Sequence, residues 1–223
     1  MDNEVRPPKN YIVYDFVRIT AAIPGLLVLR PKLVYENENA RKKLRGGILL
    51  IANHGGFFDP VHLMLSIRSR RHHFVCTKEF FEGNRLKRWL FRQFHCIPID
   101  RDNFSMGSLR RITDELKQGH LVSMFPEGHV VNDGSIAPFK SGMVLMAVQA
   151  GCPILPVYVK KREHFLSRLI VAVGEPVDIK ALYGPRPSLG QIEETAAMLH
   201  EKESVLRDLC AGTGKHAAEN ADK

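Results

Sequence analysis

The chain has 223 residues, 44% of them apolar, which is enough to bury one sizeable core, and we expect a single domain. Thirty-two Lys and Arg against 24 Asp and Glu leave a formal charge of +8. This charge favours anionic partners without choosing among phospholipid, coenzyme phosphates, an acidic carrier protein and nucleic acid. The four cysteines are scattered and no cleavable leader pattern is present, so we expect a reducing cytosolic setting rather than a disulfide framework.

The first 31 residues are expected to form a helical, membrane-associating segment. Residues 11–29 are rich in aromatic and aliphatic side chains and predict a helix that is interrupted at Pro24. The apolar run Ile19 to Leu29 is shorter than the roughly 20 residues that span hydrocarbon. We therefore expect an interfacial helix or a packed hairpin rather than a membrane span.

Short apolar runs alternate with amphipathic stretches over residues 32–210, which we expect to form the main domain. Apolar residues on both faces of a short strand are typical of a sheet that is covered by helices. The sequence thus predicts an α/β fold with a mixed, mostly parallel central sheet of about seven strands flanked by helices. The predicted strands are 32–35, 47–52, 73–77, 96–99, 121–125, 154–159 and 169–173.

Helical patterns separate several of these strands. Residues 105–118 have one apolar face, and Gly119 follows where a left-handed cap is needed. Residues 140–150 are apolar nearly all round and predict a buried helix. The last helix is expected to begin with a capping box at 187–191 and to run to about Cys210, before a disordered tail over 211–223.

The strongest local signal is the segment NHGGFFDP at 53–60, directly after a predicted strand. This order places His54 at the carboxyl edge of the sheet, where ligand sites of open α/β folds lie, and the glycines allow a substrate to approach closely. Asp59 is near enough in sequence to accept a hydrogen bond from one ring nitrogen of His54, leaving the other as a base. Asp59 before Pro60 is also an ordinary helix start.

The segment FPEGH at 125–129 follows another predicted strand and precedes Lys140. Glu127 could accept a hydrogen bond from a substrate hydroxyl, while the loop around Gly128 and Lys140 could present N–H groups and positive charge to an anion. A turn with a solvated Glu is the alternative.

A charged cluster, DRD, follows the strand predicted at 96–99. Arg101 could bind two phosphate oxygens through its planar guanidinium. A surface ion pair with Asp100 or Asp102 is equally compatible with the sequence.

These three segments and the run Ile154 to Val157, in this order and spacing, resemble the four sequence blocks of the glycerolipid acyltransferase family, the PlsC-type lysophosphatidic acid acyltransferases. The first block of the family, Asn-His-x-Ser-x-x-Asp, is similar to NHGGFFD, and its third, Phe-Pro-Glu-Gly-Thr-Arg-Ser, is similar to FPEGHVV. The resemblance extends from about Tyr35 to Val177.

The resemblance implies an O-acyltransferase that moves a fatty acyl group from acyl-CoA or acyl carrier protein to 1-acyl-glycerol-3-phosphate. It assigns proton abstraction to His54, support of the imidazolium to Asp59, acceptor seating to Glu127 and Gly128, and phosphate binding to Arg101. A metal ion, another cofactor or a covalent nucleophile is then not required. The thioester is already activated, and backbone N–H groups near Gly55 or Gly56 are candidates for the oxyanion stabiliser.

Two departures from the family pattern concern the acceptor. Gly56 replaces the usual Ser, and His129 with Val130 replaces a Thr-Arg pair that the family associates with the acceptor phosphate. Lysophosphatidic acid remains the first acceptor, with Arg101 and Lys140 supplying charge. Another lysolipid, or a catalytically silent lipid-binding protein of the same fold, is the alternative.

Residues 80–94 interleave aromatic and apolar side chains with Arg85, Lys87, Arg88 and Arg92, which suits an anionic lipid interface. A packed helix with a solvated basic face is the alternative. We expect peripheral or monotopic attachment to the cytoplasmic face of a membrane and no nucleic-acid partner. The isolated histidines, among them His62, His95 and His120, show no metal-ligand spacing, and we expect surface or core roles for most of them.

Overall fold

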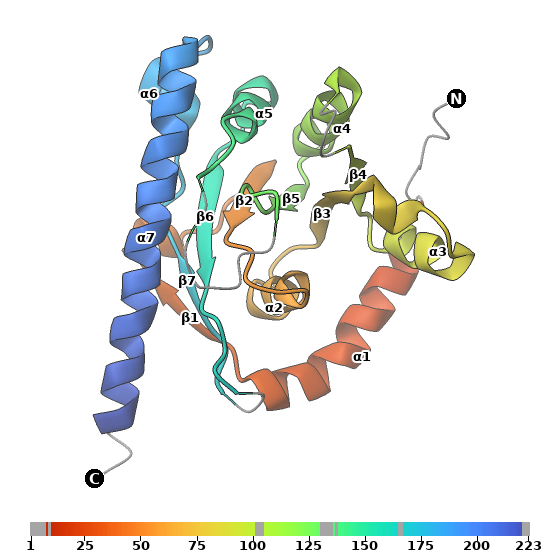
Figure 1. Ribbon diagram of the computed structural model, residues 1–223, viewed down its shortest axis with the longest axis vertical. Helices are drawn as coiled ribbons and strands as arrows, with labels where there is room; N and C mark the ends of the chain where they lie inside the picture. The colour runs from red at the N-terminus through yellow and green to blue at the C-terminus, as the bar shows by residue number, and fades with distance from the viewer. Residues whose placement is uncertain are drawn as a thin grey trace.

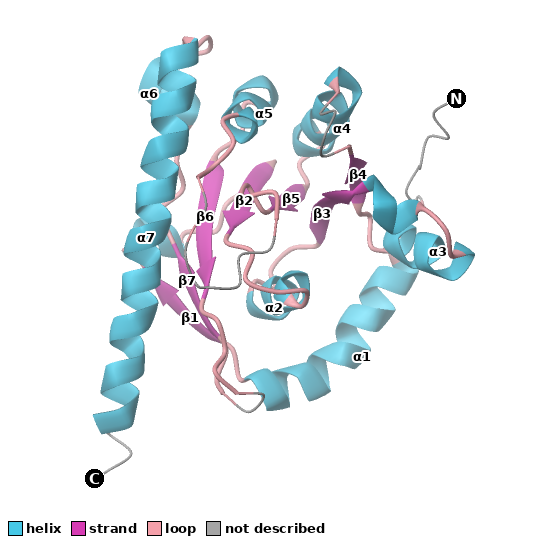
Figure 2. Cartoon of the chain, viewed as in Figure 1, coloured by secondary structure: helices cyan, strands magenta, loops and turns pink. Residues whose placement is uncertain are grey.

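A computed structural model describes residues 8, 10–100, 105–129, 136, 138–164 and 167–219, with the side chains of 213–219 left out. Its strands form one seven-stranded sheet in the order β1-β7-β6-β2-β5-β3-β4 (Figure 2). All pairs are parallel except β6 with β7, so β1 and β7 run against the other five. The strands are β1 (Lys32–Tyr35), β2 (Ile48–Ala52), β3 (His72–Thr77), β4 (Ile97–Ile99), β5 (Leu121–Met124), β6 (Ile154–Val159) and β7 (Ile170–Val173).

Helices cover both faces of this sheet (Figure 1). They are α1 (Ile12–Leu29), α2 (Asp59–Ser66), α3 (Arg85–Gln93), α4 (Met106–Lys117), α5 (Gly142–Ala150), α6 (Ile179–Tyr183) and α7 (Leu189–Glu219), with short 3-10 turns η1 (Asn39–Arg41) and η2 (Lys78–Phe81). The predicted α/β fold is confirmed, and each predicted strand boundary lies within one residue of the observed one.

The central strand β2 shows how the two hydrophobic cores arise. Its five residues are buried, and successive side chains point to opposite faces. Leu49 packs in one core with residues of α4 and α5, whereas Leu50 packs in the other with Leu63 of α2. Because β2 is covered on both faces and paired on both sides, the loop that follows it starts from a fully buried strand.

Helix α1 corrects the predicted interruption at Pro24. The helix is continuous over 18 residues, with Pro24 inside it and Arg30 closing its end in a left-handed conformation. A proline removes one backbone hydrogen bond and can be accommodated without ending a helix. The packed-hairpin alternative is therefore wrong, and the apolar segment is longer than predicted. With a mean hydropathy of 1.8, α1 is long and apolar enough to cross a membrane by length and composition alone.

Specific residues determine where α4 and α5 end and where α7 begins. Gly119 (φ +86°) and Gly151 (φ +66°) adopt left-handed conformations after α4 and α5. Before α7, the Ser188 N–H donates to Gln191 at 2.8 Å and the Gln191 N–H donates back at 3.3 Å, which confirms the capping box. The tail predicted to be disordered over 211–223 is helical as far as Glu219, because α7 continues beyond Cys210, and residues 220–223 lie outside the described residues.

Candidate active site

The loop after β2 is fixed by Asn53. Its side-chain Oδ1 accepts the Val159 N–H at 2.7 Å and its Nδ2 donates to the Val159 carbonyl at 3.1 Å. Both groups of the amide are thereby satisfied in a buried position. Asn53 thus ties the carboxyl ends of β2 and β6 together, and the next residue, His54, leaves the sheet from a rigid point.

His54 and Asp59 lie together as the sequence predicted. His54 Nδ1 is 3.1 Å from Asp59 Oδ2, and the same Asp59 oxygen accepts the Gly56 N–H at 2.7 Å. The helix-cap alternative for Asp59 is not what the structure has: Asp59 is the first residue of α2, and no side chain caps that helix. The carboxylate points back to the histidine instead, and the Nε2 side of His54 is left for a substrate.

Two neighbours restrict this pair further. The Phe125 ring stacks on the His54 imidazole with centroids 4.2 Å apart. His62, one turn along α2, places its Nδ1 3.6 Å from Asp59 Oδ1, a favourable electrostatic contact too long for a hydrogen bond. Burial alone would raise the pKa of Asp59, but the contacts from His54 and His62 and the Gly56 N–H outweigh it and lower that pKa. Asp59 is therefore a carboxylate at neutral pH.

Glu127 is not the solvated turn residue that the alternative required. Its side chain is 3% exposed, and its Oε1 accepts the backbone N–H of His54 at 3.3 Å. Glu127 therefore joins the loop after β5 to the loop after β2, directly at the histidine.

Gly128 and Lys140 are also neighbours. Gly128 has φ +75°, and a Cβ built on it would lie 3.5 Å from Lys140 Nζ. A side chain at residue 128 would thus be strained and would contact the ammonium group. Both residues line the same cavity as His54, which places one positive charge within the cavity wall.

This cavity has a volume of about 820 Å³ and a mostly apolar lining. That size and character are typical of a site for a small organic ligand. Its wall is formed by the ends of β3 and β5, by α2, by α3 and by the start of α5, and includes Phe57, Met64, Phe74, Phe91, Phe94 and Met146. Phe57, at the rim, is 73% exposed.

The remaining predicted residues have different outcomes. Arg101 lies outside the described residues, and its neighbour Asp100 accepts a hydrogen bond from Lys78 Nζ at 2.6 Å. Gly56 lies within the loop, where a Cβ would meet no atom within 4 Å.

Three features of the site were missed from the sequence. His62 follows Asp59 at helical spacing, a signal that was available. Cys76 and Cys96, distant in the sequence, come together in the cavity wall, where a hydrogen bond between their thiols and burial raise the pKa of Cys76. Glu203 of α7 is 1% exposed, and burial and the nearby charge of Glu127 raise its pKa well above the ordinary value.

A model of the family described as Acyltransferase matches residues 32–160, more than half of the chain. The protein belongs to the Acyltransferase family.

Several named proteins are similar to the chain. It is 26% identical over 194 residues to the 1-acyl-sn-glycerol-3-phosphate acyltransferase of Bacillus subtilis, and the matched region covers 84% of this chain and 93% of that protein. The Escherichia coli protein of the same name is 28% identical, and the matched region covers 78% of this chain and 71% of that protein. A probable 1-acyl-sn-glycerol-3-phosphate acyltransferase of Mycoplasma pneumoniae is 31% identical, and the matched region covers 65% of this chain and 53% of that protein.

A solved structure shares the fold. The crystal structure of the 1-acyl-sn-glycerophosphate acyltransferase PlsC from Thermotoga maritima has a TM-score of 0.62 at 20% identity, covering 88% of this chain and 79% of that one.

Proposed function

We propose that the protein esterifies the free hydroxyl of 1-acyl-glycerol-3-phosphate with a fatty acyl group from acyl-CoA or acyl carrier protein, giving phosphatidic acid for phospholipid biosynthesis. The observation that carries the proposal is the pair His54 and Asp59 in the wall of a large apolar cavity that also holds Lys140. The similar proteins of Bacillus subtilis and Escherichia coli are named for the same acceptor, which supports the proposal.

In the proposed reaction, His54 Nε2 takes the proton from the acceptor hydroxyl as that oxygen attacks the thioester carbonyl carbon. The Asp59 carboxylate stabilises the imidazolium through Nδ1 and fixes the ring tautomer. When the tetrahedral intermediate collapses, the C–S bond breaks and the imidazolium returns its proton to the departing thiolate. The products are an ester and a free thiol, and the enzyme is regenerated without a covalent intermediate.

The loop around His54 also provides for the developing oxyanion. The His54 N–H binds Glu127 and the Gly56 N–H binds Asp59, so both are already engaged. We assign the oxyanion contact to the N–H of Gly55, the residue between them. Glu127 then acts as a positioning residue, which differs from the acceptor-seating role that the resemblance implied.

The cavity fits the two kinds of group that an acyl-glycerol-phosphate carries. Its apolar wall suits an acyl chain, and Lys140 beside Gly128 suits the phosphate. We propose Arg101, two residues after the end of β4 in the sequence, as a second phosphate ligand.

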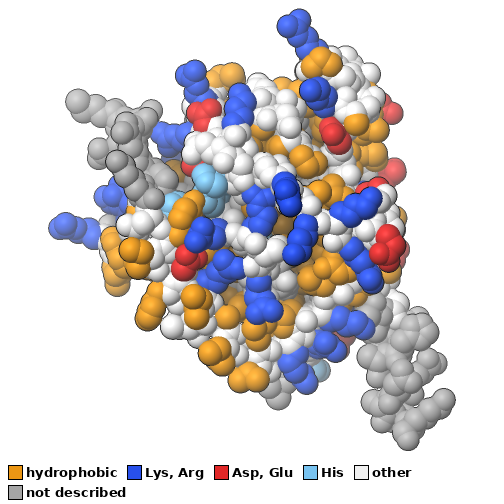
Figure 3. All heavy atoms as spheres, turned by 180° about the vertical axis from the view of Figure 1, so that it is seen from behind, with side chains coloured by type: hydrophobic (Ala, Val, Ile, Leu, Met, Phe, Trp, Pro, Cys, Tyr) orange, Lys and Arg blue, Asp and Glu red, His pale blue; other side chains and the backbone are white. Residues whose placement is uncertain are grey.

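Membrane attachment is proposed from the surface of α1 and α3. Five exposed apolar residues recur on one face of α1, with side chains 66–73% exposed: Ile12, Phe16, Ile19, Ile23 and Leu27. On α3, Leu86 and Trp89 are exposed among basic residues. Seen from behind, basic and hydrophobic side chains are mixed on the surface (Figure 3). Such a surface suits the interface of an anionic bilayer, where a lipid substrate is delivered.

A thiol-release assay tests the proposal. Purified protein is mixed with lysophosphatidic acid and either acyl-CoA or acyl carrier protein, and the lipid product is identified by mass spectrometry. The His54→Ala variant should lose about 10²–10⁴-fold in turnover. His164→Ala, which changes an exposed histidine, is the matched control and should keep the wild-type rate. Unchanged turnover by His54→Ala would overturn the mechanism.

A second acceptor is tested in the same assay because His129 and Val130 replace the Thr-Arg pair of the family. Lysophospholipids with choline, ethanolamine or glycerol headgroups form the other arms. A higher kcat/KM with one of these lysophospholipids than with lysophosphatidic acid would identify it as the preferred acceptor and would leave the proposed acyl-transfer reaction unchanged. If no acceptor and donor pair releases thiol, the alternative of a catalytically silent lipid-binding protein of the same fold would be favoured.

A further inference from the structure

A second cluster of titratable side chains lies at the opposite edge of the sheet from His54. His73 is near the amino end of β3, and His120 immediately precedes the amino end of β5. These strands are parallel neighbours, with His73 opposite Val122. Glu115, in the last turn of α4, reaches the same place. The cluster therefore belongs to the amino edge of the strands, whereas the candidate active site lies at their carboxyl edge.

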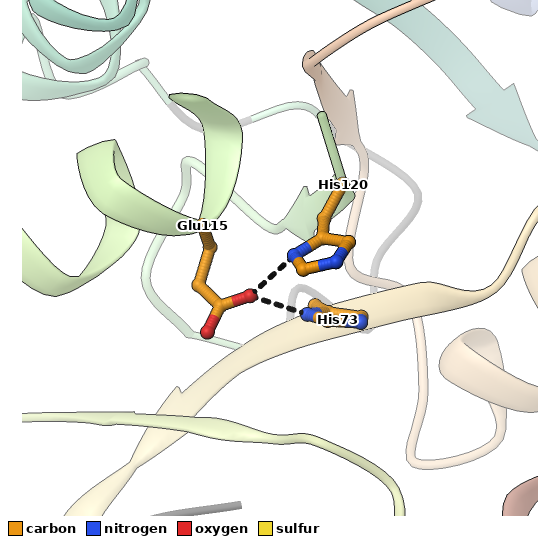
Figure 4. A group of neighbouring side chains, drawn as sticks. All are labelled: His73, Glu115 and His120. Atoms are coloured by element: carbon orange, nitrogen blue, oxygen red, sulfur yellow. Dashed lines mark hydrogen bonds and ion pairs between the residues drawn. The ribbon is translucent and has the colours of Figure 1, made fainter. Parts of the chain in front are cut away.

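The three side chains converge on one point (Figure 4). Glu115 Oε2 is 2.9 Å from His73 Nδ1 and 2.7 Å from His120 Nδ1. One possible ligand atom from each residue lies within 4.8 Å of the others. Tetrahedral zinc with ligands at about 2.0–2.2 Å would hold its ligand atoms roughly 3.4 Å apart, so small movements of these side chains would admit the ion.

The three side chains range from buried to partly exposed. The side chain of His73 is 2% exposed, that of Glu115 is 20% exposed and that of His120 is 32% exposed. One ligand is thus anchored in the protein and another faces solvent, which provides an entry path.

The outer ring nitrogen of His73 already has a suitable partner. Its Nε2 lies 3.0 Å from the hydroxyl of Tyr11, which stacks on His95 with centroids 4.0 Å apart. A metal on Nδ1 would place the ring proton on Nε2, where it can donate to the Tyr11 oxygen. Metal-ligating histidines commonly use their second nitrogen in this way. The charge of nearby Arg71, which lies over the Tyr11 ring, is matched by Asp15 at 2.7 Å.

We propose that His73, Glu115 and His120 bind a divalent transition-metal ion of the zinc class, with solvent in the fourth position. Two imidazoles and one carboxylate suit Zn²⁺ and do not suit Mg²⁺, which prefers an all-oxygen octahedral shell. Through His73 and Tyr11 the ion would fasten the start of α1 to the sheet. The proposal departs from the surface or core roles expected for most of the isolated histidines, because residues 73, 115 and 120 come together only in the fold.

Titration of the full chain, purified without a histidine tag and freed of metal, tests this site with Zn²⁺ alone. Calorimetry should show one saturable equivalent, and the thermal midpoint should rise with Zn²⁺ and not with equal Mg²⁺. Glu115→Gln, nearly isosteric, and His120→Ala, partly exposed, should each weaken binding at least 10-fold. His164→Ala is the control for an exposed histidine and should bind as wild type.

Two further variants separate this site from others. Tyr11→Phe should weaken Zn²⁺ binding by about 10-fold, as loss of an outer hydrogen-bond partner does. His54→Ala should bind Zn²⁺ as wild type, because the candidate active site lies at the other edge of the sheet. Equal binding by wild type, Glu115→Gln and His120→Ala would overturn the proposal, as would the absence of saturable binding by the wild type.

Discussion

Glu127 accepts the backbone N–H of His54 at 3.3 Å, so the carboxylate holds the loop of the histidine rather than pointing into the cavity as a free anion. Glu127→Gln keeps an oxygen acceptor and should retain kcat within about 10-fold. Glu127→Ala removes the acceptor, and a displacement of the base by about 1 Å can cost roughly 10²-fold in kcat. Steady-state kinetics with acceptor and donor varied separately measures both effects. A rise in acceptor KM with little change in kcat would instead indicate direct acceptor binding.

Asp59→Asn should lower kcat by about 10²–10⁴-fold, because the neutral amide cannot stabilise the imidazolium or fix the His54 tautomer as a carboxylate does. His62→Gln, at the longer contact of 3.6 Å, should cost less than about 10-fold. Thiol release under saturating donor measures both variants, with circular dichroism to check folding. If Asp59→Asn works at the wild-type rate, Asp59 has only a structural role.

Glu203→Gln should stabilise the protein increasingly as the pH rises. The folded pKa of Glu203 is raised by burial and by the charge of Glu127, so the folded state holds a proton that the unfolded state has released. The stability that the Glu203 carboxyl group contributes is fully present below its pKa in the unfolded chain, about 4.3, and is lost as the pH rises through its pKa in the folded protein. Thermal midpoints at pH 5 and pH 8 measure the effect. Glu201→Gln, at an exposed residue of the same helix, should show no such trend. If the thermal midpoint of Glu203→Gln differed from that of the wild type by the same amount at pH 5 and pH 8, the prediction would be contradicted.

Gly128→Ala should lower the free energy of unfolding by roughly 1–2 kcal/mol, because residue 128 has φ +75°. The added methyl group would also contact Lys140, so the acceptor KM should rise. Gly107→Ala, in the first turn of α4 without a positive φ, should be neutral or slightly stabilising. Urea unfolding and initial rates measure the pair of variants. Equal stability of the two would show that the loop relaxes around residue 128.

Ile19→Glu with Ile23→Glu should weaken binding to anionic vesicles by at least about 10-fold, since both side chains belong to the exposed apolar face of α1. Leu189→Glu, at an exposed leucine of α7, is the control for added charge on an apolar surface. Co-sedimentation with phosphatidylglycerol vesicles measures both variants. Unchanged binding by the double variant would place the membrane contact elsewhere.

Local sequence patterns predicted the strands of the sheet and the contact between His54 and Asp59 well. All seven strands were short apolar runs, and His54 and Asp59 are separated by one loop, so chain proximity limited where they could lie. The continuity of α1 was not predicted, because a proline disfavours a helix locally while a long apolar helix with one packed face can tolerate it.

Contacts between distant segments could not be read from the sequence. Glu203 lies at Glu127 only because α7 packs across β6 and β7, and Cys76 meets Cys96 only because β3 pairs with β4. The cluster of residues 73, 115 and 120 likewise depends on the pairing of β3 with β5. Each feature needs the strand order, which short patterns do not specify.

The contrast between β2 and α3 has a consequence for local opening. All five residues of β2 are buried, whereas no residue of α3 is buried. Leu90 and Phe91 of α3 line the cavity, and so does His54, which follows β2 in the chain. Amide hydrogens of β2 should therefore exchange only through global unfolding, and those of α3 through frequent local opening. One wall of the cavity can thus open locally, as entry of the proposed acyl chain would require, while His54 in the loop after β2 keeps its position.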